Sequence, residues 1–378
     1  MIRVAGLKKL FAAGIIVSSA DKLTPLEQLR EIRKYLHQEQ QVVEHCMNGI
    51  LKKLEPEGIS IKLYKDVNQH QRHYLNRYFN ENIYPVIIPI AVDATHPFPH
   101  LNNLSFGLIV KLQDSDNTAI ERFGIIRVPR VLDRFIELEH DIYVPIESLV
   151  AEHVEDLFPG YTLIKFASFR VTRNADIEIE EEEADDFLEI LEEGLKLRRK
   201  GAMVRLEVGS DGDEEIVNFF NRHTNVYKDD IYKFHTFLNL SSLWQIVSNK
   251  HFAHLLTEPF KQKTLPPLDN SENIFTTLEK QDILLYHPYE SFDPIVKLIQ
   301  TAAKDPDVVS IKMTLYSSGT DSPIVKALMS ASESGKQVTV MVELKARFDE
   351  ENNLRWAKAL EDAGAHVVYG IPGLKVHA

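Results

Sequence analysis

Arg347 has a side chain and a position suited to phosphate binding. It lies in the segment 345–349, which follows a predicted strand and precedes a predicted helix. A guanidinium beside the amides of a helix N-terminus offers oriented, positively charged donors, and this combination binds phosphate. The alternative is a surface arginine paired with Asp349 or Glu350, and the spacing alone does not separate the two.

His377 is the second candidate for chemistry, in the segment 373–378 that we predict as a strand. A neutral imidazole is a competent nucleophile toward phosphorus near neutral pH. Phosphoryl transfer depends mainly on positioning and charge neutralisation. A lone histidine is more often structural or exposed, so both interpretations stay open. The pairs 70/73, 96/100 and 251/254 lack the carboxylate partners of a zinc motif and are assigned to packing or solvent.

A regular alternation of strands and helices positions these two residues. Such a rhythm predicts a parallel or mixed sheet covered by helices, and ligands of open α/β sheets bind beyond the carboxyl ends of the strands. The loops 317–321, 345–349 and 370–377 lie at such ends. The predicted strands are 282–286, 308–316, 337–344 and 365–369, and the predicted helices are 294–303, 323–334 and 350–363.

The sequence divides into three predicted domains. Residues 1–58 form a helical domain, with a helix that starts at Thr24 and Pro25, a favourable N-cap and first position. Residues 59–263 mix short strands, such as 85–90, 106–110 and 123–128, with a helix over 181–200, and are predicted as an α+β domain. Residues 264–378, after a proline-containing linker, form the α/β domain.

Composition narrows the functional class. The chain has 378 residues, 44% hydrophobic and 26% charged, with a net charge of −13. Such a surface does not attract nucleic acid as a whole, so an anionic ligand needs a local basic site. The single cysteine, Cys46, excludes an internal disulfide and favours a reducing compartment. No stretch approaches the ~20 apolar residues of a membrane span.

Several segments of the chain resemble one known family. The block 342–353 (VELKARFDEENN), followed by 356–358 (WAK) and 373–378 (GLKVHA), is similar to polyphosphate kinases, whose catalytic half has a phospholipase-D-like fold. The resemblance extends over essentially the whole chain and is densest after Asp282. The supporting segments are 1–7 (MIRVAGL), 169–176 (FRVTRNAD), 283–292 (ILLYHPYESF) and 321–325 (DSPIV).

The resemblance implies a function and roles for particular residues. It implies reversible transfer of the ATP γ-phosphate to inorganic polyphosphate with Mg²⁺, through a phosphohistidine that falls on His377. Two family arginines that contact phosphate, and are associated with magnesium through it, map onto Arg347 and Ser317. It further implies a multidomain α/β fold with a middle (head) domain, a cytoplasmic location and a homo-oligomer. No nucleic acid and no integral membrane segment are implied.

The sequence departs from the family pattern at Ser317. A serine offers one neutral hydroxyl where a bidentate, permanently charged guanidinium is expected. Losing one such contact costs roughly 1.5–3 kcal/mol unless a neighbour such as Lys312 compensates. The resemblance also leads us to expect further family segments before Met1 and after Ala378, without which the chain is expected to be inactive. The alternatives are a phospholipase-D-class phosphodiesterase or nuclease, and a divergent, non-catalytic polyphosphate-binding copy.

Overall fold

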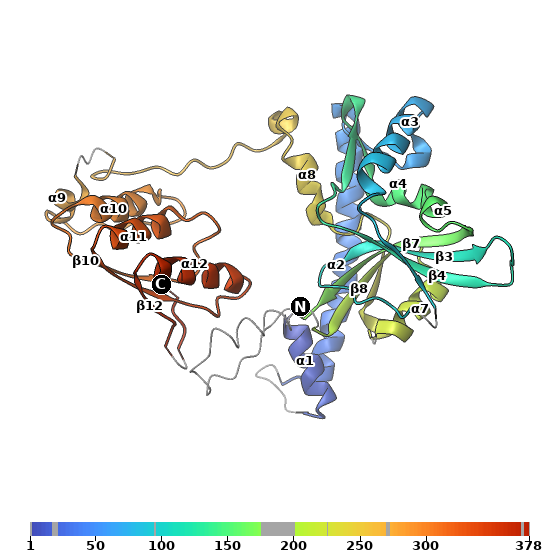
Figure 1. The fold of residues 1–378 in the computed structure, drawn as a ribbon, viewed down its shortest axis with the longest axis horizontal. Helices are drawn as coiled ribbons and strands as arrows, with labels where there is room; N and C mark the ends of the chain where they lie inside the picture. The colour runs from blue at the N-terminus through green and yellow to red at the C-terminus, as the bar shows by residue number, and fades with distance from the viewer. Residues whose placement is uncertain are drawn as a thin grey trace. The chain divides into compact units, whose positions relative to one another are not determined.

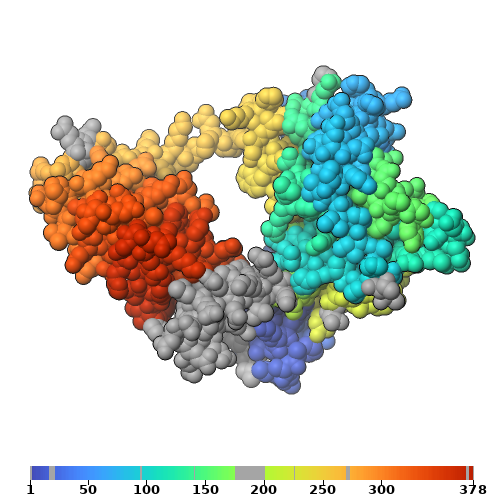
Figure 2. Space-filling model, in the orientation of Figure 1, coloured from blue at the N-terminus to red at the C-terminus, as the bar shows by residue number. Residues whose placement is uncertain are grey.

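The computed structural model describes residues 2–16, 22–93, 96–174, 201–224, 226–269, 273–371 and 374–377. The described residues as far as Leu256 form one compact unit, and those from Thr257 form a second (Figures 1 and 2). Helices and mixed or parallel sheets build both units, which confirms the multidomain α/β class. The predicted helix over 181–200 lies outside the described residues, and the three domain boundaries stay predictions.

The first unit begins with two helices, α1 (Ile2–Ala12) and α2 (Pro25–Leu54). Thr24 starts α2 as predicted: its hydroxyl accepts from the Glu27 amide, and the Glu27 carboxylate accepts from the Thr24 amide at 2.8 Å. This reciprocal pairing satisfies amides that lack partners within the helix. The two helices share a small core whose buried members are Val4, Ala5, Leu7, Leu29 and Val204.

A six-stranded sheet is the centre of the first unit, in the order β2-β4-β3-β7-β8-β9. All neighbours are antiparallel except β8 and β9, which run parallel. The predicted strands at 106–110 and 123–128 are confirmed, whereas the one at 85–90 begins only at Pro89. The amides of Val86 and Ile87 instead bond the Ile83 carbonyl and close a helical turn. The bounds are β2 Pro89–Val92, β3 Phe106–Asp114, β4 Glu121–Val128, β7 Tyr161–Arg173, β8 Met203–Gly209 and β9 Ile231–Phe234.

Both faces of this sheet are buried. Along β3, Leu108 and Val110 join one apolar core and Ile109 joins the other, which explains the uninterrupted apolar run of this strand. In Figure 1, α4 and α5 lie on one side of these strands and α7 lies on the other. The helices are α3 Gln69–Tyr78, α4 Ile146–Glu152, α5 Val154–Leu157, α7 Glu214–Thr224 and α8 Trp244–Val247, and a smaller sheet holds β1 Ser60–Ile61, β6 Ile142–Pro145 and β5 Phe135–Leu138.

The second unit is built on three parallel strands in the order β10-β11-β12. The predicted alternation is confirmed to within about two residues at each element end, except for the strand at 282–286. The strands are β10 Ser310–Leu315, β11 Gln337–Val342 and β12 His366–Val368, and the helices are α9 Ile274–Leu278, α10 Asp293–Lys304, α11 Pro323–Glu333 and α12 Glu350–Asp362.

The helices of the second unit cover one face of its sheet. Ile311 and Leu315 of β10 are buried against this layer, while Lys312 and Thr314 between them are exposed on the other face. The alternation fixes the register, because a shift by one residue would expose the apolar set. The core is formed chiefly by Val325, Leu328, Val338, Val340, Val342, Ala357 and Leu360.

Two strand predictions are wrong. Residues 282–286 form no strand: Leu284 is 92% exposed, and the Tyr286 amide bonds the Glu290 carboxylate at 2.6 Å. An apolar run becomes a strand only beside a partner, and in the described residues none pairs with it. Residues 375–377 also form no strand, because the Val376 amide bonds a side-chain carboxylate instead of a neighbouring backbone.

Candidate functional site

The carboxyl ends of β10 and β11 are tied together by one buried amide, Asn353 of α12. Its Nδ2 atom donates to the Tyr316 carbonyl at 2.6 Å and to the Glu343 carbonyl at 2.8 Å. Only 1% of Asn353 is exposed. These two carbonyls end their strands, where no further ladder partner is available, so the amide satisfies groups that would otherwise be buried unpaired. The strand ends and the start of α12 therefore form one fixed platform.

The segment that carries His377 is attached to this platform by Glu343. The buried Glu343 carboxylate accepts from the Val376 amide at 3.0 Å. Lys375 adds a hydrogen bond from its Nζ to the Lys345 carbonyl at 2.7 Å and lies 3.7 Å from a Glu343 oxygen. These contacts hold the backbone next to His377 at the end of β11.

His377 lies at the surface, against the residue that follows β10. Its ring meets the Tyr316 ring edge-on, with centroids 5.0 Å apart and planes at 70°. The side chain is exposed and outside the apolar core. An edge-on aromatic contact restricts the orientation of the imidazole ring and leaves much of its surface accessible to a substrate. A nucleophile requires this access.

Arg347 occupies the turn between β11 and α12, as predicted, and is exposed. The turn is sharp: the next residue, Phe348, has a φ of 70°, in the left-handed region that a bulky residue rarely adopts. The Asp349 amide closes it on the Ala346 carbonyl at 3.0 Å. The side chain of Asp349, at the N-cap of α12, makes no capping hydrogen bond.

Asp349 is engaged by Ser317 instead. The Ser317 hydroxyl donates to Asp349 Oδ2 at 2.6 Å and joins the loops that follow β10 and β11. The structure thus brings His377 against Tyr316, the neighbour of Ser317, and brings Ser317 against Asp349, two positions from Arg347. All three predicted residues therefore lie on elements that meet at the carboxyl end of one sheet.

Lys312 is a poor replacement for a guanidinium at position 317. It lies on the exposed face of β10, five residues earlier. Along an extended strand this separation is about 16 Å. Lys375 is a cation of the site itself, where its Nζ atom donates to the Lys345 carbonyl after β11.

A magnesium ion fits this site only if phosphate supplies most of its ligands. No group of three or more metal-ligating side chains was found among the described residues. Mg²⁺ is commonly held by one or two carboxylates together with substrate phosphates and water. Asp349, half-buried at the end of the sheet, is the carboxylate that could meet such an ion.

Two residues of the site escaped the sequence analysis, Glu343 and Asn353. Both are polar and buried where a strand ends or a helix begins. A carboxylate closing an apolar strand could have been noticed as unusual in a core. The pairs 70/73, 96/100 and 251/254 belong to the first unit, whereas this site belongs to the second. His254, for example, bonds the carbonyl of His251 within a short 3₁₀ helix over Lys250–Leu255.

A parallel α/β sheet whose carboxyl end gathers a histidine, an arginine and a hydrogen-bonded serine–aspartate pair defines a protein with a candidate phosphate-handling site. Sequence models of three domains match the chain: the polyphosphate kinase N-terminal domain over residues 1–62, its middle domain over 70–246 and its C-terminal domain 1 over 273–378. The chain belongs to the polyphosphate kinase family.

Individual relatives agree over the whole chain. It is 60% identical to a polyphosphate kinase of Campylobacter jejuni subsp. doylei and 42% identical to polyphosphate kinase 1 of Chlorobaculum tepidum, with 100% of this chain covered in both. The crystal structure of polyphosphate kinase from Porphyromonas gingivalis superposes with a TM-score of 0.77 at 25% identity, covering 99% of this chain and 53% of that one. The chain spans about half the length of these relatives, 54% and 55% for the two sequences.

Among the described residues, no helix combines the length and the apolar character that crossing a bilayer demands.

Proposed function

We propose that the protein reversibly transfers the γ-phosphate of ATP to inorganic polyphosphate through a phosphohistidine at His377. The observation that carries this proposal is the exposed imidazole at the carboxyl end of the β10–β12 sheet, on the same edge as Arg347. Family membership supports the substrates, because relatives over the full chain are named polyphosphate kinases.

The forward half-reaction is an in-line displacement. The lone pair of one His377 ring nitrogen forms a bond to the γ-phosphorus as the bond to the β,γ-bridging oxygen breaks, and ADP leaves with that electron pair. The Tyr316 edge limits the directions that the imidazole can take. Arg347 supplies positive charge where the transferred group carries negative charge. In the second half-reaction a terminal polyphosphate oxygen attacks the phosphohistidine and the P–N bond breaks.

Magnesium bound to the phosphates would neutralise charge on the β- and γ-oxygens. The contribution of this chain is then to orient the complex. Asp349 would face the ion from the start of α12, where Ser317 now holds its carboxylate. We extend the proposal to a cytoplasmic homo-oligomer; the single thiol, exposed Cys46, suits a reducing compartment.

The test uses the protein at its gene-encoded length, with ATP labelled on the γ-phosphate and Mg²⁺. We expect an acid-labile, base-stable phosphoprotein that His377→Ala abolishes. His366→Ala is the matched control, because His366 is an exposed histidine of β12 in the same unit. Label that persists in His377→Ala would place the nucleophile elsewhere, and hydrolysis of a phosphodiester without labelling would support the phosphodiesterase alternative.

A second variant tests the charge at the site. Arg347→Gln should lower the rate of labelling by about 10³-fold or more if the guanidinium stabilises the transferring group. Arg355→Gln, an exposed arginine of α12 that donates to the Thr320 carbonyl, is the control. If full-length protein with an unaltered sequence binds polyphosphate but forms no phosphohistidine, the chain is the non-catalytic copy that Ser317 allows.

A further inference from the structure

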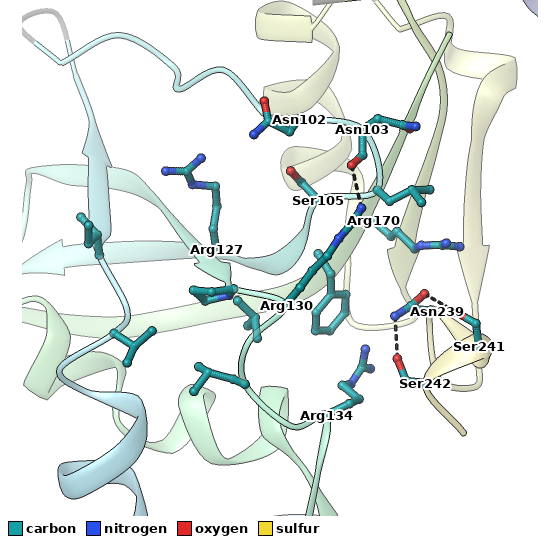
Figure 3. A pocket seen from close by; sticks show the side chains of 17 residues that line it. Asn102, Asn103, Ser105, Arg127, Arg130, Arg134, Arg170, Asn239, Ser241 and Ser242 are labelled. Carbon is teal, nitrogen blue, oxygen red and sulfur yellow. Dashed lines mark hydrogen bonds between the residues drawn. The ribbon is translucent and has the colours of Figure 1, made fainter. Parts of the chain in front are cut away.

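A cavity of about 880 Å³ opens on the first unit, and none of its described lining residues belongs to the site described above. It lies where β4 and β3 meet the loops around residues 102–105 and 239–242. Figure 3 shows arginine side chains from several elements around it. The lining residues are Val86, Ile88, Asn102, Asn103, Leu104, Ser105, Phe106, Arg127, Val128, Pro129, Arg130, Leu132, Arg134, Arg170, Asn239, Ser241 and Ser242.

The charge of this lining opposes that of the whole chain. Arg127, Arg130, Arg134 and Arg170 contribute to it, and no aspartate or glutamate does among the residues that the structure describes. The chain as a whole carries −13. A cluster of like charges in one concave site is costly for the folded protein unless a ligand of opposite charge uses it. A cavity with only cationic and neutral walls selects an anion.

Two of these arginines have no carboxylate partner. In the described part of the chain, the Arg127 side chain makes no hydrogen bond or ion pair, and the Arg130 side chain donates only to the Asn103 carbonyl at 3.2 Å. Both belong to the end of β4 and the loop after it, and they are half-buried and exposed respectively. Their guanidinium charge is available to a ligand.

The other two arginines, Arg134 and Arg170, each pair with a glutamate and each keep a guanidinium N–H group without a partner in the described chain. Arg134, 7% exposed, pairs with Glu147 through Nε and Nη2, while its buried Nη1 has no partner among the described residues. Arg170 lies 3.5 Å from Glu207, and its buried Nε likewise has none in the described chain. Buried guanidinium donors without partners are costly, and a bound anion drawing these side chains toward it would lower that cost.

The walls favour a chain of phosphates over a nucleotide. Phe106 is the one aromatic residue in the described lining, and the Arg134 guanidinium lies 3.8 Å from its ring centroid. That face is therefore not open for a nucleobase to stack on. The arginines are distributed around the cavity, as a repeating anion requires, whereas a nucleotide concentrates its charge at one end.

We infer that this cavity is a second binding site for linear inorganic polyphosphate, distinct from the site that includes His377 and Arg347. Arg127 and Arg130 would contact successive phosphoryl groups, with Asn102 and Ser105 as further polar partners. The inference rests on the proposed function for the identity of the polymer. A site that binds the polyphosphate between transfer steps would keep the polymer from dissociating from the protein.

The binding test uses the 378-residue chain, short-chain polyphosphate of defined length, and no ATP. Arg127→Gln combined with Arg130→Gln should weaken binding by at least about tenfold, since a charge-assisted contact to phosphate is worth roughly that factor or more. The matched control combines Arg77→Gln and Arg222→Gln, which remove the same charge from exposed arginines of α3 and α7. Thermal unfolding curves should show that every variant is folded at the temperature of the binding measurement.

The outcomes separate this inference from the proposed function. Equal weakening in the control pair, or none in Arg127→Gln/Arg130→Gln, would overturn the second site. So would competition by ATP or by single-stranded DNA at the same phosphate concentration as polyphosphate. Binding that survives His377→Ala and Arg347→Gln but is lost in the Arg127/Arg130 variant supports the cavity whether or not a phosphohistidine forms.

Discussion

The hydroxyl of Ser317 donates to the carboxylate of Asp349 at 2.6 Å, which joins the loops after β10 and β11 across the candidate site. The Asp349 carboxylate, at the N-cap of α12, thus accepts a hydrogen bond from a neutral donor. The family resemblance places an arginine at position 317, and a guanidinium there could both pair with Asp349 and face phosphate.

Ser317→Arg should strengthen phosphate binding at this site. A guanidinium adds a permanent charge and several donors, so we expect affinity for Mg·ATP to rise about tenfold, measured by calorimetry on the 378-residue chain. Ser318→Arg is the control for charge alone, because it changes the adjacent residue. Equal gains in both variants would show that position 317 has no special relation to the phosphates.

Glu343→Gln should loosen the segment that carries His377. Both carboxylate oxygens accept from backbone amides, of Val376 at 3.0 Å and of Lys345 at 3.2 Å, and an amide group would place a donor against one of them. We expect faster hydrogen exchange at residues 374–377 and about tenfold less phosphohistidine in the full-length protein. Faster exchange throughout α11 as well would mean a general loss of stability instead of a local one.

Asn353→Ala should destabilise the second unit by about 1–3 kcal/mol, because it leaves the Tyr316 and Glu343 carbonyls without their donor. The neighbouring Asn352→Ala removes one hydrogen bond to the Gly319 carbonyl and one from the Arg355 side chain, both at a more exposed position, and should cost less. Urea unfolding followed by tryptophan fluorescence, with Trp356 in α12, compares the two. Similar losses would contradict a special role for Asn353.

The first unit should lose stability at acid pH through the ammonium–carboxylate network that joins α7 to the sheet. Hydrogen bonds from Lys165 lower the pKa of Asp213, and those from Lys111 and then Lys165 lower the pKa of Glu215. Groups with a lower pKa in the folded state stabilise it above their ordinary pKa, and this contribution is lost as the pH falls through the folded value.

Glu215→Gln should therefore flatten the dependence of unfolding free energy on pH below about 4.5, by a few tenths to about 1 kcal/mol, since the carboxylates are part-exposed. Glu214→Gln is the control, because that side chain is 78% exposed and the Lys228 ammonium, its ion-pair partner, is 3.8 Å away. Thermal unfolding across the acid range measures both. An unchanged profile in Glu215→Gln would exclude the network as the cause.

The local signals in the sequence were sufficient to predict much of the fold. Thr24 and Pro25 marked the start of α2, and the period of apolar residues located α10 to α12 and β10 to β12. The strand at 282–286 failed because an apolar run does not reveal whether a partner strand lies beside it. The segment 375–377 failed for a related reason: a side chain, Glu343, takes the place of a neighbouring strand.

The site was only partly accessible to the same reasoning. The loops of Arg347 and Ser317 follow from the rule that binding residues lie at strand ends. The roles of Glu343 and Asn353 depend on bonds that span 33 and 37 positions. No local pattern encodes such distances. The arginines of the cavity likewise come from separate elements and converge only after folding.

The attachment of the His377 segment has a mechanical consequence. Side chains hold it, through the Glu343 carboxylate and the Lys375 ammonium, where a ladder of backbone hydrogen bonds would hold a strand of the sheet. Breaking the bond between the Val376 amide and Glu343 removes no pair from the β10–β11 and β11–β12 ladders, so the residues next to His377 can move while the pairing of the strands stays intact.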